Sequence, residues 1–431
     1  MLSTEARASL RVTCRIARGR LGAVSSSTVP SCSSTSAATL RARQLSTTVL
    51  TPAKHTSSKQ AIPSSSIRLR SFTTGPPRSS QQPFQFLTAY AFQGKPRSSD
   101  DLPQEGDSPT SASSVNEEDG SSAAAAETSA MKAQIGFPAD SEIGRWRDEL
   151  LRGGEAGEDS LMCTSMGAQG DVAIGVADGV GGWTENGIDP SLFSQALMFY
   201  ASQSAAKPEE AAAPNRILAE AFEHVLKEPL VVAGSATACI LTLKSSDGTL
   251  RSANLGDSGF VILRQGTGKQ GVFYASPPQQ LGFNTPLQLA KLPKEWIQEG
   301  LISNTPKDAA AWECTLQHGD LIIVGTDGLF DNVDAKIEIP QFAKFIKEKH
   351  HALYAARHAA DAAGEAKHDS LAEDREFVQV LATNLVEYAK ICQNTTTKQS
   401  PFEREAARYG IHFPGGKVDD VALVCCLVIE Q

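Results

Sequence analysis

Three apolar stretches of this chain begin or end at aspartates, so any fold that buries them must place carboxylates at the edge of its core. The stretches are VAIGVADGVGGW at 172–183, LIIVGTDGLFDN at 321–332 and GKVDDVALVCCLVI at 416–429. Asp178, Asp327 and Asp419 are far apart in sequence, so they can meet only where the fold brings the three strands together. Singly, each suits a helix cap or a surface turn. Together, at the ends of buried strands, they indicate a shared divalent cation.

Charge divides the chain into two parts. Residues 1–99 contain 14 Lys and Arg and a single acid, Glu5, so they carry +13; subtracting this from the total of −9 leaves −22 for residues 100–431. With 41% apolar residues in 431, the chain can bury a sizeable core. The strongly acidic second part argues against nucleic acid as a partner.

The basic part has the composition of an organelle transit peptide, since it is rich in Arg and Ser and poor in acids. Arg7, Arg11, Arg15 and Arg18 recur every three or four positions and share one face of a helix. We therefore predict a mitochondrial presequence at 1–45 and a matrix location, with the mitochondrion favoured over the plastid. The alternative is a basic tail that binds nucleic acid or membrane.

The segment that follows is low in large apolar residues. Residues 46–130 consist mainly of Ser, Thr, Ala, Pro and Gly, so we predict a disordered linker there and a folded domain at 131–431. No apolar run reaches the roughly 20 residues that span a bilayer. Cys425 and Cys426 are adjacent and should point to opposite faces of a strand, and we expect all eight cysteines to be reduced.

Strand and helix signals come in blocks from residue 161 onward. Strand candidates, many of them joined by short turn-rich links, lie at 161–165, 171–177, 235–243, 250–254, 259–264, 271–275, 313–316, 320–325 and 420–429. Helical periodicity predicts helices at 192–204, at 215–227 with Asn215 as the N-cap, and at 371–392. Turn-rich links at 246–248 and 256–258 are typical of antiparallel hairpins. The pattern favours an α+β layered fold over a doubly wound parallel sheet.

The Ala-rich segment near residue 350 contains a group of histidines. The group comprises His350, His351, His358 and His368. No acidic pattern accompanies them in the sequence, which favours a solvated helix face over a metal site.

The Asp-Gly corners suit hard divalent ions, because Mg²⁺ and Mn²⁺ prefer oxygen ligands. Asp178 with the Gly179 carbonyl and Asp327 with Gly328 behind it make a credible two-metal centre, completed by Asp419 and Asp159. Glycine lets the backbone turn toward the same ion. Two close ions would acidify a bridging water and neutralise a phosphoryl oxygen, which gives in-line phosphate hydrolysis without a covalent enzyme intermediate.

Six motifs together resemble the metal-dependent protein serine/threonine phosphatases of type 2C, and within them the mitochondrial branch. The motifs are Glu158-Asp159, ADGVGGW at 177–183, SATA at 235–238, ANLGDS at 253–258, TDGLFDN at 326–332 and Asp419-Asp420. Each is weak alone, but their order and spacing are specific. The resemblance implies a four-layer α-β-β-α sandwich, in which helices flank two antiparallel sheets and the metal site lies at the sheet edge.

The resemblance also implies roles for single residues. Asp178 should bridge two Mg²⁺ or Mn²⁺ ions, the Gly179 carbonyl should bind the first, Asp327 and Asp419 should bind the second, and Asp159 should act through water. Two further aspartates, Asp257 and Asp331, match positions that hold a looser third ion in some members.

Two positions depart from the common pattern of that family. Val180 stands where many relatives have a His that is proposed to protonate the leaving group, and Gly154 stands where many have an Arg that clamps phosphate. The mitochondrial branch is similar to this chain at the first of these positions.

These observations predict a monomeric phosphatase that acts on phosphoserine and phosphothreonine in mitochondrial proteins. One alternative is a catalytically weak pseudophosphatase that acts as a binding module, as the absent His and Arg would allow. Another is a metal-dependent phosphodiesterase or nuclease. The GDSG sequence at 256–259 resembles a serine-protease signature, but no histidine base accompanies Ser258, so we expect a hairpin turn.

Overall fold

The computed structural model describes part of the chain. The described residues are 84–96, 136–167, 170–207, 213–267, 271–293, 295, 304–363 and 371–430. The predicted presequence at 1–45 and most of the predicted linker at 46–130 lie outside these residues. Among the described helices, none combines the length and apolarity needed to cross a bilayer.

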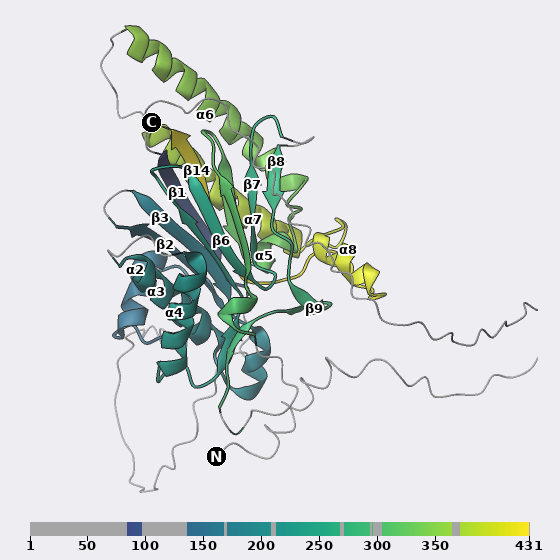
Figure 1. Cartoon of the computed structure of the whole chain (residues 1–431). Helices are drawn as coiled ribbons and strands as arrows, with labels where there is room; N and C mark the ends of the chain where they lie inside the picture. Colours follow the sequence, from purple (N-terminus) through teal and green to yellow (C-terminus); the bar gives the residue numbers. More distant parts are fainter. Residues whose placement is uncertain are drawn as a thin grey trace, which may run out of the picture. The chain divides into compact units, whose positions relative to one another are not determined.

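Two five-stranded antiparallel sheets form the centre of the domain (Figure 1). The first has the strand order β1-β14-β13-β7-β8 and the second β12-β6-β5-β3-β2; β10 pairs with β9, and β11 with β4, in two small ribbons. The strands are β1 Phe84–Gln93, β2 Asp159–Met166, β3 Asp171–Asp178, β4 Gly234–Ala236, β5 Ala238–Leu243, β6 Thr249–Leu255, β7 Gly259–Leu263, β8 Val272–Ala275, β9 Gln280–Gly282, β10 Thr285–Pro286, β11 Leu289–Lys291, β12 Ala310–Thr315, β13 Leu321–Gly325 and β14 Val421–Glu430.

Helices cover the outer face of each sheet (Figure 1). In the second sheet α3 packs on β2 and β3, with α4 beside it, and in the first sheet α7 packs on β1 and β14. The helices are α2 Glu142–Leu151, α3 Pro190–Ala205, α4 Pro214–Lys227, α5 Asp327–Phe330, α6 Glu338–Ala363, α7 Ala372–Gln393 and α8 Pro401–Arg408, with 3₁₀ turns η2 Gly181–Asn186 and η4 Pro306–Asp308. The α-β-β-α expectation is confirmed.

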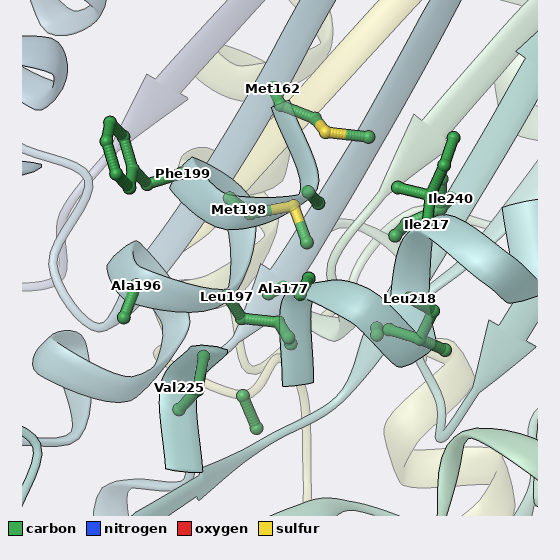
Figure 2. Packing of buried hydrophobic residues seen from close by; sticks show 14 of the residues in the cluster. Met162, Ala177, Ala196, Leu197, Met198, Phe199, Ile217, Leu218, Val225 and Ile240 are labelled. Atoms are coloured by element: carbon green, nitrogen blue, oxygen red, sulfur yellow. The ribbon is translucent and has the colours of Figure 1, made fainter. Parts of the chain in front are cut away.

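Three apolar layers hold these elements together. One lies between the sheets, one between the second sheet and α2, α3 and α4, and one between the first sheet and α5, α6 and α7. Figure 2 shows the second of these, where Leu197 and Met198 of α3 pack beside Ile217 and Leu218 of α4. The adjacent cysteines of β14 do face opposite layers: Cys425 lies on the helix side and Cys426 between the sheets.

Strand β1 corrects the predicted linker, because it lies inside 46–130. It pairs with β14 along its whole length, from Phe84 opposite Glu430 to Gln93 opposite Val421. Its side chains alternate, with Phe84 and Phe86 between the sheets and Leu87 on the helix side. Ten residues of period-two pattern were hidden by the polar composition of the long segment around them.

Three local predictions were wrong in detail. The N-cap of α4 is Ala213, which makes no side-chain cap, and the helix begins at Pro214 because proline is suited to the first helical turn. The link at 256–258 is not a hairpin, since β6 and β7 belong to different sheets. Residues 350–363 of the histidine segment lie in α6, and His368 is outside the described residues. His350 is only 3% exposed and contacts the buried Asp374 on α7 at 2.8 Å. That acid is close in space and 24 residues away in sequence.

Candidate metal centre

Asp159 and Asp178 lie side by side at one edge of the second sheet. Asp159 begins β2, Asp178 ends β3, and the two residues are partners in the antiparallel register. The Asp159 carboxylate accepts a hydrogen bond from Thr326 Oγ1 at 2.8 Å, and the Asp178 amide donates to Thr237 Oγ1 at 3.2 Å. Both aspartates are therefore placed by the strand pairing and by neighbouring hydroxyls.

Asp327 comes from the first sheet, where it begins the short helix α5 directly after β13. The following residue must be glycine, because a Cβ at Gly328 would lie 1.8 Å from the carbonyl oxygen of Asp420. This close approach brings the end of β13 against the beginning of β14. The Asp-Gly sequence thus serves packing as well as chemistry at this corner.

Gly179 meets a similar steric limit. A Cβ there would lie 2.7 Å from the Glu158 carbonyl oxygen and 2.8 Å from that of Pro190. Its amide donates to the Glu158 carbonyl at 3.1 Å. The backbone after Asp178 is therefore closely packed between the start of β2 and the start of α3, which only glycine permits.

Asp257 joins this edge because the link from β6 to β7 crosses from the second sheet to the first. One carboxylate oxygen each from Asp178, Asp257 and Asp327 lie within 4.8 Å of one another. Oδ2 of Asp257 accepts from Gln280 Nε2 at 2.9 Å, whereas its buried Oδ1 has no hydrogen-bond partner among the described residues. Such an oxygen is costly to bury unless a cation binds it, so these three residues fit a divalent ion.

The pKa values of the buried aspartates also reflect a lack of neighbouring positive charge. Burial raises the pKa of Asp178 well above its ordinary value, and the neighbouring carboxylates raise it further. Asp159 responds in the same way, and burial raises the pKa of Asp257 to about 6. Carboxylates this close cannot all ionise without a cation between them.

Asp419 lies next to this group but is held by two lysines. Its carboxylate is 3.0 Å from Lys417 Nζ and 3.6 Å from Lys95 Nζ. Burial alone would raise its pKa, but these two ammonium groups hold the pKa below its ordinary value. Among the described residues, the partners of the Asp419 carboxylate are therefore these two lysines and the Asp420 amide, which donates to its Oδ1 at 3.0 Å.

Asp331 ends α5 and also contacts Lys417 Nζ, at 3.1 Å. Burial raises the pKa of Asp331 to about 8, although Lys417 lowers it. Of the two aspartates matched to a third ion, Asp257 thus groups with Asp178 and Asp327, and Asp331 groups with Lys417.

Sequence reasoning missed both lysines. Lys95 follows β1, which the composition of the surrounding segment concealed; its amide donates to Asp420 Oδ1 at 2.6 Å and its ammonium to Glu158 at 2.8 Å. Lys417 stands two residues before Asp419, so its proximity could have been noticed. Nothing in the sequence indicates that its side chain reaches Asp327 and Asp331.

The family model described as Stage II sporulation protein E (SpoIIE) matches residues 168–378. The "Protein phosphatase PTC7 homolog fig" of Drosophila mojavensis is 36% identical over 274 residues, 63% of this chain and 78% of the relative. The "Protein phosphatase PTC7 homolog" of Homo sapiens is 32% identical over 287 residues, 66% of this chain and 84% of the relative.

A structure described as "X-ray structure of the photosystem II phosphatase PBCP" is 26% identical, with 66% of this chain and 95% of that chain covered and a TM-score of 0.47. This chain covers more than two thirds of the length of both curated relatives. The chain therefore belongs to the PTC7 family of type 2C protein serine/threonine phosphatases.

Proposed function

We propose that this phosphatase hydrolyses phosphoserine and phosphothreonine in mitochondrial proteins, and that it uses two Mg²⁺ or Mn²⁺ ions to do so. The observation that carries the metal part is the convergence of Asp178, Asp257 and Asp327 from three separate strand ends, with one buried oxygen of Asp257 lacking a partner.

In this proposal Asp178 and Asp327, with the Gly179 carbonyl, hold the ions, and Asp159 and Asp419 complete the centre. When bound, such ions neutralise phosphoryl oxygens and lower the pKa of a water that attacks phosphorus. The protein keeps these carboxylates in position through strand register, through the Thr326 and Thr237 hydroxyls and through the glycines that the packing requires. Preorganisation of this kind is the part of catalysis that the fold itself supplies.

Two positions limit the mechanism. Val180 has no titratable proton, so it cannot protonate a leaving group. A Cβ at Gly154 would lie 2.7 Å from the Phe92 ring, so an arginine that clamps phosphate would require this ring of β1 to move. Binding and protonation of the substrate must therefore use other groups than those two positions.

The test is a phosphatase assay on the full chain with an aryl phosphate and Mn²⁺. Asp178→Asn should lose about a thousandfold in turnover, because several kcal/mol of charge stabilisation would be removed. A chelator should stop the wild type. Asp247→Asn is the matched control, since Asp247 caps a turn between β5 and β6, where its side chain accepts from the Thr249 amide at 2.9 Å.

The same assay separates the alternatives. If wild type and Asp178→Asn are equally inactive at saturating Mn²⁺, the chain acts as a binding module. Turnover of phosphodiesters in preference to monoesters would favour a diesterase or nuclease instead.

The location is proposed from residues 1–45 alone. A fluorescent reporter that carries these residues should enter mitochondria, and a reporter that stays in the cytosol would contradict the proposal. The proposed monomeric state is checked by the elution volume of the purified chain in gel filtration.

A further inference from the structure

Lys417 is held rigidly against α5 by a single buried side chain. Its amide donates to Asn332 Oδ1 at 2.9 Å, and its carbonyl accepts from Asn332 Nδ2 at the same distance. Asn332 is fully buried and also donates to the Gly328 carbonyl at 2.9 Å. The backbone of Lys417 is therefore fixed to the helix that begins with Asp327.

The Lys417 ammonium contacts three carboxylates. It binds Asp327, lies 3.1 Å from Asp331 and 3.0 Å from Asp419, and stands 5.3 Å from the centre of the Phe402 ring. Its side chain is 16% exposed. An ammonium has three N–H donors, so one carboxylate for each uses its full capacity. Three carboxylate contacts are usual for a bound metal cation and unusual for the ammonium of a surface lysine.

Asp327 belongs to two groups of ligands. It contributes an oxygen to the cluster with Asp178 and Asp257, and it also binds the Lys417 ammonium. The lysine therefore stands beside the ion position of that cluster, on the side where Asp331 and Asp419 lie. Asp331, unlike Asp327, is not part of that cluster, so an ion at Asp331 would depend on a carboxylate that the ammonium already contacts and would be repelled by it.

We propose that Lys417 is a resident cation of the metal centre, which takes the place of a third divalent ion at Asp331 and limits the chain to two ions. The inference rests on the proposed metal centre and concerns a residue that the proposed mechanism does not use. Charge at this corner is then supplied by the chain itself and does not depend on the metal concentration.

The count of bound ions tests the inference. Isothermal titration with Mn²⁺ and metal analysis after gel filtration should give two ions per chain for the wild type and three for Lys417→Gln, because the vacated carboxylates become available. Lys417→Arg retains the charge and should stay at two. An equal count for Lys417→Gln and the wild type, with binding intact, would overturn the inference alone.

Lys398→Gln is the matched control. Lys398 also combines a carboxylate partner with an aromatic ring, since its Nζ is 2.9 Å from Glu338 and 4.9 Å from the centre of the Tyr388 ring. The Lys398→Gln variant should bind the same number of ions as the wild type. A wild type that binds no Mn²⁺ would overturn the metal centre itself and this inference with it.

A second variant covers the case in which Lys417→Gln does not fold. Asp331→Asn keeps Lys417 and should leave the count at two, because the partner of Asp331 is the ammonium. Loss of one bound ion in Asp331→Asn would identify Asp331 as a ligand and overturn the inference. The double variant Lys417→Gln, Asp331→Asn should also unfold at a higher temperature without metal than Lys417→Gln alone.

Discussion

Strand β14 connects two buried polar clusters that differ in how completely their charges and hydrogen bonds are matched. Asp419 and Asp420, directly before the strand, belong to the acidic cluster, and its last residue, Glu430, contacts a cluster on α6, α7 and the turn before β13. Ten residues of strand separate the two, which is about 30 Å at the usual rise. We call the second group, made of His318, His350 and Asp374, the histidine chain.

The histidine chain has a partner for each ring nitrogen. The Glu430 amide donates to His318 Nδ1 at 3.1 Å, which assigns the His318 proton to Nε2. That proton faces His350 Nε2 at 3.2 Å, and His350 in turn donates from Nδ1 to Asp374 at 2.8 Å. Because Nε2 of the neutral His318 ring carries the proton, this nitrogen has no free lone pair with which to bind a metal. The histidine chain thus connects β14, α6, α7 and the turn before β13.

The acidic cluster is the opposite case. It holds more carboxylates than its two lysines can neutralise, and one buried oxygen of Asp257 has no partner among the described residues. Where buried polar groups satisfy one another they support the fold, and where they do not they indicate a ligand or a reaction. The difference predicts opposite responses of the two clusters to mutation, metal and pH.

The largest expected effect is in the histidine chain. His350→Leu should lower the free energy of unfolding by about 3 kcal/mol, because it removes the 2.8 Å contact between the His350 ring and the buried Asp374 carboxylate. Chemical denaturation measures this. Turnover with Mn²⁺, taken well below the unfolding transition, should be unchanged. An unchanged free energy of unfolding would show that the histidine chain contributes nothing to stability.

Metal should stabilise only through the acidic cluster. Mn²⁺ at a hundredfold excess over its Kd should raise the free energy of unfolding by about 2.7 kcal/mol in the wild type. His350→Leu should gain a similar amount, whereas Asp178→Asn should gain much less. Thermal unfolding with and without chelator measures the three proteins. Equal stabilisation of all three would place the bound metal elsewhere.

Acid should stabilise the metal-free acidic cluster. Burial raises the pKa of Asp257 to about 6, above the ordinary value near 3.9, so between these values the folded chain binds more protons than the unfolded chain. The free energy of unfolding should therefore increase as pH falls, by about 1 kcal/mol between roughly pH 7 and 5 from Asp257 alone. Asp257→Asn should remove this part of the pH dependence. If metal-free Asp257→Asn and wild type show equal pH profiles, the explanation is wrong.

The smallest effect is expected one residue from the histidine chain. His351 lines an open cavity with His318 and Lys347 and is exposed. His351→Ala should change the free energy of unfolding by no more than about 0.5 kcal/mol, as is usual for surface positions. A loss similar to that of His350→Leu would show that stability there depends on the whole segment and not on the matched hydrogen bonds.

Much of the acidic edge of the two sheets could be predicted from local sequence patterns. Apolar runs that end at Asp178 and Asp327 located two strand ends, and the two-residue period assigned Cys425 and Cys426 to opposite faces. These features depend on residues close in sequence, since a strand alternates its side chains whatever it pairs with. The layered fold followed from the order of the strand and helix blocks.

By itself, the sequence determined which residues are carboxylates, where most strands of the two large sheets other than β1 lie, and where α3, α4 and α7 lie. The tertiary structure alone decided the rest: that β1 pairs with β14, that Asp257 lies with Asp178 and Asp327, that Lys95 and Lys417 contact Asp419, and that Asp374 binds His350. The reason is that periodicity and turn chemistry act over a few residues. The partner of a buried charge, by contrast, is set by sheet register and by the packing of segments that lie hundreds of residues apart.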